Sequence, residues 1–157
     1  MREIPLTQGK VALVDDEDYE TLARFRWRAC RNGNVYYAQR RGNKAIGEPT
    51  VVYIHREILN APNGSLVDHR DGDGLNNIRP NLRLVTRSQN LQNSRRSKRN
   101  TSGHKGVSWN KARGKWSANI GHDSELIHLG LYSTREEAYA AYCEASAKFH
   151  GAFGRTA

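Results

Sequence analysis

A stretch of ten residues without an apolar side chain constrains this fold more than any other feature of the sequence. Residues 94–103 read SRRSKRNTSG and end in glycine. Such a segment cannot contribute a face to a hydrophobic core, and its Ser, Asn and Gly residues favour linkers and turns. It divides the 157-residue chain into two parts, each of a size that supports one modest core. We therefore predict a domain at residues 1–94, a basic linker at 95–103 and a second domain at 104–157.

The charge distribution predicts a polyanionic partner. The chain has a formal net charge of +9 and a pI near 9.9, which favours nucleic acid or an anionic membrane surface. The 49 residues between Asp73 and Asp123 contain no acidic residue but eleven basic ones. These are Arg79, Arg83, Arg87, Arg95, Arg96, Lys98, Arg99, Lys105, Lys111, Arg113 and Lys115. We interpret this basic window as a phosphate track, with a solvated basic surface as the alternative.

Several classes of protein are disfavoured. No apolar run approaches the roughly 18 residues needed to cross a bilayer, and the basic window has no amphipathic helix with a broad apolar face. We therefore expect no membrane partner. Residues 1–20 resemble neither a signal peptide nor a transit sequence, which favours a cytoplasmic protein. Cys30 and Cys143 stand 113 positions apart, outside any zinc-binding spacing, so we expect two buried thiols.

Hydrophobic periodicity predicts a β-rich platform in the first domain. Alternating apolar residues indicate strands, and Asn32-Gly33 is the strongest short signal for a hairpin turn. Val51, Val52, Ile54, Ile58 and Leu59 have helical spacing. The predicted elements are strands at Ile4–Leu6 and Val11–Val14, a helix from Asp15 or Asp16 to Leu22, strands at Phe25–Ala29 and Val35–Ala38, and a helix from about Tyr53 to Leu59.

The second domain is predicted to be a three-stranded antiparallel sheet packed on one helix. We expect strands at Gly106–Trp109, Lys115–Ile120 and Ile127–Leu129. Ser133 and Glu136 have the spacing of a capping box at the start of the helix. The apolar stripe of that helix comprises Ala138, Ala141, Tyr142, Ala145 and Phe149. Together the two domains predict an α+β fold.

Residues 67–93, VDHRDGDGLNNIRPNLRLVTRSQNLQN, are unusually rich in Asp, Asn and His. The segment predicts a strand that ends at Val67-Asp68, a tight glycine-containing loop, and a second strand around Leu84–Thr86. A helix is expected to begin near Ser88. The three elements form a ββα unit.

The side chains of this unit suit phosphodiester hydrolysis. Asp68 and Asn90 supply hard oxygen ligands of the kind Mg²⁺ accepts, and His69 is the natural general base for an attacking water. A base and a charge-neutralising metal are what this reaction needs. The alternative for Asp71 and Asp73 is an ordinary role in a turn. His55 is a minor candidate, since a histidine on a short helix is more often packed than catalytic.

The order of these motifs resembles the HNH, or ββα-metal, endonuclease family, particularly its phage and intron-encoded branch. The resemblance covers 27 residues and rests on DH, D-G, NN, NL, VT and QN in that order. It implies that His69 is the general base, that Asn81 pins the loop, and that Asp68 and Asn90 are the metal ligands. Asn90 stands where the family name has a final histidine, a known habit of this branch. Supporting residues would be Asn76, Asn77 and Asn93.

Residues 103–157 are similar to the plant APETALA/ethylene-response-factor, or AP-two/ERF, DNA-binding domain. The landmarks GV, GKW, LG, EEA-AY and HG keep their order. With the basic linker, the resemblance implies that DNA is bound by Arg95, Arg96, Lys98, Arg99, Lys105, Ser108, Asn110, Arg113, Lys115, Asn119 and His128. At Ser108, Asn110 and Gly121 this chain lacks an arginine that the plant domain uses, so the GC-rich plant target does not carry over.

The sequence therefore predicts an HNH DNA endonuclease that nicks or cuts both strands of double-stranded DNA with Mg²⁺ or Mn²⁺, in an arrangement that resembles homing endonucleases. One alternative is a non-catalytic DNA-binding regulator with a degenerate HNH scaffold. An RNA-directed nuclease is another, because phosphate binding does not distinguish the sugars. The recognition sequence and the oligomeric state stay open.

Overall fold

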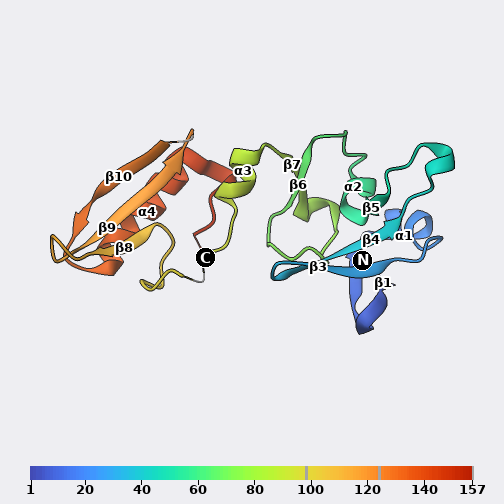
Figure 1. Ribbon diagram of the computed structural model, residues 1–157, viewed down its shortest axis with the longest axis horizontal. Helices are drawn as coiled ribbons and strands as arrows, with labels where there is room; N and C mark the ends of the chain where they lie inside the picture. The colour runs from blue at the N-terminus through green and yellow to red at the C-terminus, as the bar shows by residue number, and fades with distance from the viewer. Residues whose placement is uncertain (98, 124, 157) are drawn as a thin grey trace. The chain divides into compact units, whose positions relative to one another are not determined.

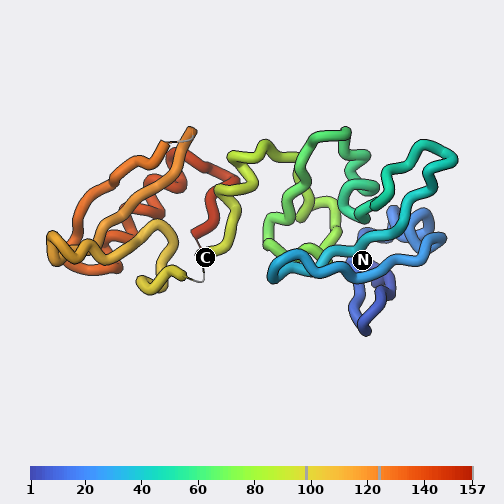
Figure 2. Tube along the Cα trace, viewed as in Figure 1, coloured from blue at the N-terminus to red at the C-terminus, as the bar shows by residue number. Residues whose placement is uncertain are grey.

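The chain has an α+β fold in two compact units, Met1–Thr86 and Arg87–Ala157 (Figure 1). The computed structural model describes residues 1–97, 99–123 and 125–156. The boundary lies upstream of the predicted domain end at residue 94, because helix α3 (Arg87–Gln92) belongs to the second unit. The described residues of the predicted linker, 95–97 and 99–103, contain no helix or strand, and the path of the chain on either side can be followed in Figure 2.

The first unit begins with two small sheets. Strands β1 (Arg2–Pro5) and β2 (Val11–Val14) pair in antiparallel fashion, and α1 (Asp16–Leu22) follows. Strands β3 (Arg28–Asn32), β4 (Val35–Arg41) and β5 (Val51–Tyr53) form a second antiparallel sheet in that order. The predicted hairpin is confirmed, but its two-residue turn is Gly33-Asn34 and not Asn32-Gly33, because Asn32 pairs with Val35 as the last residue of β3. Gly33 takes a positive φ of 59°, which glycine adopts without strain.

Two local predictions in this unit are wrong. Phe25 to Trp27 precede β3 instead of belonging to it, because the Trp27 ring is buried and its indole N–H donates to the Leu22 carbonyl at 2.8 Å. Val51 and Val52 lie in β5, where they pair with β4, and not on a helical face. The short helix itself is confirmed as α2 (Ile54–Ile58), with Tyr53 and Leu59 as its caps.

A separate two-stranded sheet forms the hairpin that bears Asp68 and His69. Strands β6 (Leu66–His69) and β7 (Leu82–Val85) are antiparallel, with Asp68 opposite Arg83 and His69 opposite Leu82. Leu82 joins Ile54, Ile58 and Trp27 in the buried core of the unit. A two-stranded sheet is only marginally stable alone, so this packing fixes the hairpin to the platform. With α3 next in sequence, the predicted ββα order is observed.

The second unit is a three-stranded antiparallel sheet with one long helix across a face (Figure 1). Strands β8 (Val107–Asn110), β9 (Lys115–His122) and β10 (Glu125–Tyr132) lie in the order β10-β9-β8. Val107, Ala118 and Ile120 on the sheet pack against the Ala138, Tyr142 and Ala145 side of α4 (Arg135–His150). The predicted sheet and helix are confirmed.

Short 3-10 turns complete the secondary structure, at Thr7–Gly9, Lys44–Ile46, Arg79–Asn81 and Gly151–Phe153. Both cysteines are reduced and half-buried, so the expectation of fully buried thiols is wrong. In the described ranges no helix is both long and apolar enough to cross a membrane.

The capping box of α4 lies one residue later than predicted. Thr134 is the N-cap and accepts from the Glu137 N–H through Oγ1 at 3.2 Å, while Glu137 Oε2 accepts from the Thr134 N–H at 3.1 Å. Glu136 instead pairs with Arg135 on the exposed surface. The prediction at Ser133 and Glu136 is therefore wrong by one position, because Thr134 can close the reciprocal bonds.

Replacing Thr134 by alanine should destabilise the start of α4, since loss of an N-cap side chain typically costs about 1 kcal/mol. Native-state hydrogen exchange of the first α4 amides should become about fivefold faster, the factor that corresponds to this energy. Ser133→Ala is the matched control and should leave the exchange rates unchanged, because only its backbone N–H binds Glu137. The opposite ranking of the two variants would contradict the assignment of the cap.

Candidate active site and nucleic-acid interface

The hairpin buries two polar side chains at its end. Asp68 and His69 are 6% and 5% exposed. His69 Nε2 lies 3.2 Å from Asn77 Oδ1, and the Asn77 amide nitrogen donates to the Leu75 carbonyl at 2.9 Å. That second bond turns Asn77 Oδ1 toward the imidazole, so Nε2 is the donor. A neutral imidazole protonated at Nε2 has its basic lone pair on Nδ1.

Burial favours the neutral form of this imidazole. Desolvation lowers the pKa of His69, and the hydrogen bond to Asn77 and the carboxylates of Asp71, Asp68 and Asp73 oppose that effect only in part. Near pH 7 the ring is therefore uncharged and able to accept a proton.

The rings of Tyr37 and His55 contact His69, and Tyr53 packs behind them as an aromatic wall. The His55 ring centroid lies 5.0 Å from that of His69 in an edge-to-face arrangement, and Tyr37 lies 5.9 Å from His69. His55 also stacks on Tyr53 at 5.3 Å. Burial lowers the pKa of His55 to about 3, and its Nδ1 has no hydrogen-bond partner among the described residues. From the sequence, His55 was a minor candidate and neither tyrosine was predicted, because their strand pattern carries no sign of this contact.

Asn81 closes the loop between β6 and β7. Its Oδ1 accepts from the Asp71 N–H at 3.1 Å, and its Nδ2 donates to Asp71 Oδ1 at 3.0 Å and to the Asn76 carbonyl at 2.7 Å. Asn76 Nδ2 donates to the other Asp71 oxygen at 2.7 Å. Asp73 accepts from the Leu75 N–H at 3.0 Å. These contacts match the implied loop-pinning place of Asn81, and they give Asp71 and Asp73 the turn roles that were the alternative.

Two arginines of the basic window are held by acidic side chains. Arg83 Nε and Nη2 donate to Asp68 Oδ2 at 2.8 and 2.7 Å, and both side chains are nearly buried. Arg79 donates to both carboxylate oxygens of Asp18, and its backbone N–H donates to Asp15 at 2.7 Å. These arginines stabilise the hairpin and its loop, so the phosphate track is shorter than the sequence indicates.

Asn90 and the other predicted site residues belong to different compact units of the chain. It is exposed on α3 in the second unit, whereas Asp68, His69 and Asn81 belong to the first. Across residues 1–97, 99–123 and 125–156, no group of three or more His, Cys, Asp or Glu side chains is placed to hold a metal ion. Joint metal binding by Asp68 and Asn90 therefore stays a prediction.

The sheet of the second unit presents a polar face opposite α4. Because side chains alternate along a strand, the burial of Val107, Ala118 and Ile120 under α4 turns their neighbours to the other face. The register pairs Ser108 with Ser117, Asn110 with Lys115, and Asn119 with His128. The predicted DNA-binding residues of the strands thus share one face, and Arg113 lies in the turn between β8 and β9.

A hydrogen-bonded group orders the centre of this polar face. Asn119 Oδ1 lies 3.0 Å from His128 Nδ1, and Asn119 Nδ2 donates to Ser117 Oγ at 3.1 Å. The amide of Asn119 is therefore oriented, which requires a proton on Nδ1 of His128. Ser117 was absent from the predicted set, although strict alternation with Lys115 and Asn119 could have identified it.

The predicted basic residues next to the sheet differ in their surroundings. Lys105 is half-buried, and its ammonium donates to the carbonyls of Gln92 at 2.6 Å and Ser94 at 2.8 Å. The expectation of a lysine directed at DNA does not match this position. Arg95, Arg96 and Arg99 are exposed, whereas the prediction for Lys98 lies outside the described residues.

Comparisons with known proteins relate the hairpin region to a known family. Residues 60–92 match the HNH endonuclease family. Protein 3.8 of Escherichia phage T7 is 34% identical over 91 residues, which cover 52% of this chain and 75% of the phage protein. The Ethylene-responsive transcription factor WRI1 of Arabidopsis thaliana is 35% identical over 77 residues, which cover 45% of this chain and 18% of the plant protein. No solved structure matches the chain.

Replacing Arg83 by methionine should strongly destabilise the first unit. The change keeps most of the side-chain volume but leaves the buried Asp68 carboxylate without this partner, and breaking one side of a buried ion pair typically costs about 3–5 kcal/mol. Arg70→Met is the control, since Arg70 is exposed at the end of the same hairpin. Urea unfolding measured by circular dichroism distinguishes the two. Equal midpoints for both variants would contradict a stabilising role of the Asp68–Arg83 pair.

Proposed function

The chain belongs to the same family as phage T7 Protein 3.8 and carries the HNH endonuclease match at residues 60–92, and from this premise we propose that it is a metal-dependent DNA endonuclease. The observation that carries the proposal is His69. Its Nε2 is bound to Asn77, its ring is buried, and its neutral form has the basic lone pair on Nδ1. A histidine in this state is suited to act as a general base.

In the proposed reaction, a water molecule attacks the phosphorus of a phosphodiester while His69 Nδ1 accepts one of its protons. The new P–O bond forms as one ester P–O bond breaks, and the leaving sugar oxygen takes a proton from solvent water. Asn77 fixes the tautomer, and the edge-to-face contact with His55 and the tilted contact with Tyr37 restrict the plane of the ring. Asn81 holds the loop that begins beside His69. When the base is already oriented before substrate binds, little of the binding energy is needed to align it.

We propose that Asp68 and Asn90 hold the divalent ion, Mg²⁺ or Mn²⁺. A carboxylate and an amide carbonyl are the hard oxygen donors that these ions prefer, and a site with few protein ligands leaves positions for water and for phosphate oxygens. The buried Asp68 carboxylate and the exposed Asn90 amide are compatible with this donor set. When bound, the ion supplies positive charge against the charge that develops on the phosphate and the leaving oxygen.

We further propose that the polar face of the second unit binds double-stranded DNA, as the AP-two/ERF resemblance implies. Exposed Lys115 and the arginines of the linker suit phosphate, whereas Asn119 and His128 suit base edges in the major groove. The similarity to a plant protein named as a transcription factor supports this part of the proposal. In this division of labour, the first unit supplies the base and the second supplies most of the affinity.

Cleavage by His69→Ala tests the assignment of the base. Nicking of supercoiled plasmid with Mn²⁺ should fall by about 10²–10⁴-fold, the usual effect of losing a general base, while duplex affinity in EDTA stays unchanged. His128→Ala is the matched control and should show the reverse, with weaker binding but a normal rate at saturating DNA.

Other outcomes of this experiment favour the alternatives. A wild-type protein that binds the duplex and never cuts it, with any divalent ion, would be a regulator with a degenerate HNH scaffold. Faster cleavage of RNA than of the matched DNA duplex would make it an RNA nuclease. Full nicking by His69→Ala would remove His69 from the mechanism.

Asn90→Ala tests the metal site with little risk to folding, because the side chain is exposed. Loss of one of two protein ligands should weaken Mn²⁺ binding about tenfold or more, measured by calorimetric titration in the presence of a non-cleavable duplex. Ser88→Ala changes an exposed residue of the same helix that is not proposed as a ligand and should bind Mn²⁺ as the wild type does. Identical titrations for the two variants would place the metal elsewhere.

A further inference from the structure

Two hydrogen bonds from the Lys105 side chain attach helix α3 to the rest of the second unit, and the proposed function gives them no role. The Lys105 ammonium, half-buried just before β8, donates to the carbonyls of Gln92 and Ser94 at the C-terminal end of α3. Carbonyl groups at the C-terminal end of a helix lack intrahelical partners and carry partial negative charge. A lysine there supplies both a hydrogen-bond donor and a positive charge. Burial and the nearby Arg155 lower the pKa of Lys105 to about 8.

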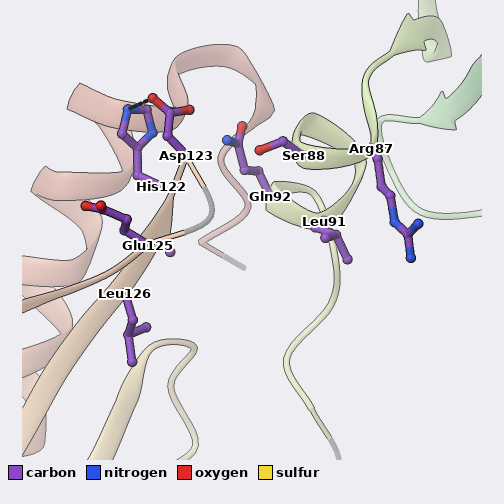
Figure 3. A pocket seen from close by; sticks show the side chains of 9 residues that line it. Arg87, Ser88, Leu91, Gln92, His122, Asp123, Glu125 and Leu126 are labelled. Carbon is purple, nitrogen blue, oxygen red and sulfur yellow. Dashed lines mark ion pairs between the residues drawn. The ribbon is translucent and has the colours of Figure 1, made fainter.

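Further contacts of α3 lie within the same unit. Ser88, Leu91 and Gln92 of α3 line one side of a groove of about 500 Å³, and Figure 3 shows them opposite side chains from the ends of β9 and β10. His122 and Leu126 line the facing wall. The helix also contacts the C-terminal turn Gly151–Phe153. Since the helix has only six residues and such helices are unstable alone, its conformation depends on these external contacts.

We propose that Lys105 is a positioning residue of the nuclease, which fixes the C-terminal end of α3 and thereby the side chain of Asn90. The catalytic part of this inference rests on the proposed function, because it takes Asn90 as a metal ligand. The structural part, that Lys105 holds α3 in place, does not. The second unit, which is proposed to bind DNA, then also orders a helix of the ββα unit. Cutting the chain at the linker would therefore not separate DNA binding from nuclease activity.

This role differs from the DNA contact that the resemblance implies for Lys105. An ammonium with two carbonyl partners has at most one N–H left for another acceptor. Moving it to a phosphate would leave the carbonyls of Gln92 and Ser94 without this donor. Lys115 shows the contrast, since it is exposed on the polar face of the sheet. It provides the matched control.

The test compares Lys105→Met, Lys105→Arg and Lys115→Met in the full chain. In Lys105→Met, native-state hydrogen exchange of the amides near the end of α3 should become about tenfold faster, as expected for loss of charge-assisted hydrogen bonds. Duplex affinity in EDTA should stay within about twofold of the wild type, because no phosphate contact is lost. The cleavage rate at saturating DNA should fall about tenfold with little change in KM, the pattern of a lost positioning contact.

The other two variants separate positioning from DNA contact. Lys105→Arg should recover most of the exchange protection and most of the rate, because a guanidinium can also donate to the two carbonyls. Lys115→Met should weaken duplex binding while the α3 amides exchange as in the wild type. If Lys105→Met weakens DNA binding as Lys115→Met does and leaves α3 exchange unchanged, the proposal is overturned. If the wild type shows no metal-dependent cleavage, the proposed function fails, whereas the exchange data still decide whether Lys105 holds α3.

Discussion

The burial of an imidazole and a carboxylate at the end of a two-stranded hairpin is the constraint on which the first unit depends. A polar group removed from water must find partners inside the protein, or its burial costs several kcal/mol. Asp68 is paired with Arg83 directly across the hairpin, and His69 is bound to Asn77. Asn77 is itself fully buried, and its backbone N–H donates to the Leu13 carbonyl at 2.8 Å. The strand end that bears Asp68 and His69 is thus tied to the N-terminal sheet.

This chain of bonds explains why a small hairpin needs a β-rich platform. The Leu13 N–H donates to the Leu75 carbonyl at 2.9 Å, so strand β2 pairs with the loop in both directions. Arg79 adds an ion pair to α1 on the same side of the loop. The platform therefore orders the loop, the loop orders Asn77, and Asn77 orders the catalytic candidate His69. Because these bonds already order the loop in the folded protein, less conformational entropy is lost when substrate binds.

Local patterns in the sequence predicted most of the fold, whereas contacts between distant residues escaped it. Alternation and the Asn32-Gly33 turn signal predicted strands because they depend on neighbouring residues only. The strand predicted from Phe25 begins only at Arg28, since the Trp27 indole is bonded to Leu22, and nothing in periodicity indicates such a bond. For the site, motif order singled out His69 and Asn81, which the fold places at the end of β6 and just before β7, and their functional roles stay predictions. The wall of Tyr37 and Tyr53 follows from the way separate sheets pack, which a single sequence does not encode locally.

The basic residues show why charge counted along a sequence overstates the surface available to a polyanion. Of the eleven Lys and Arg residues in the acid-free window, Arg79 and Arg83 pair with carboxylates and Lys105 pairs with backbone carbonyls. At most eight of the eleven are then available for phosphate, so this window can contribute a salt slope of at most about seven, at roughly 0.9 per contact. The acidic partners Asp18 and Asp68 lie outside the window in sequence but meet it in space. An acid-free run is therefore compatible with a structural role for part of its charge, and only the exposed remainder is suited to hold DNA.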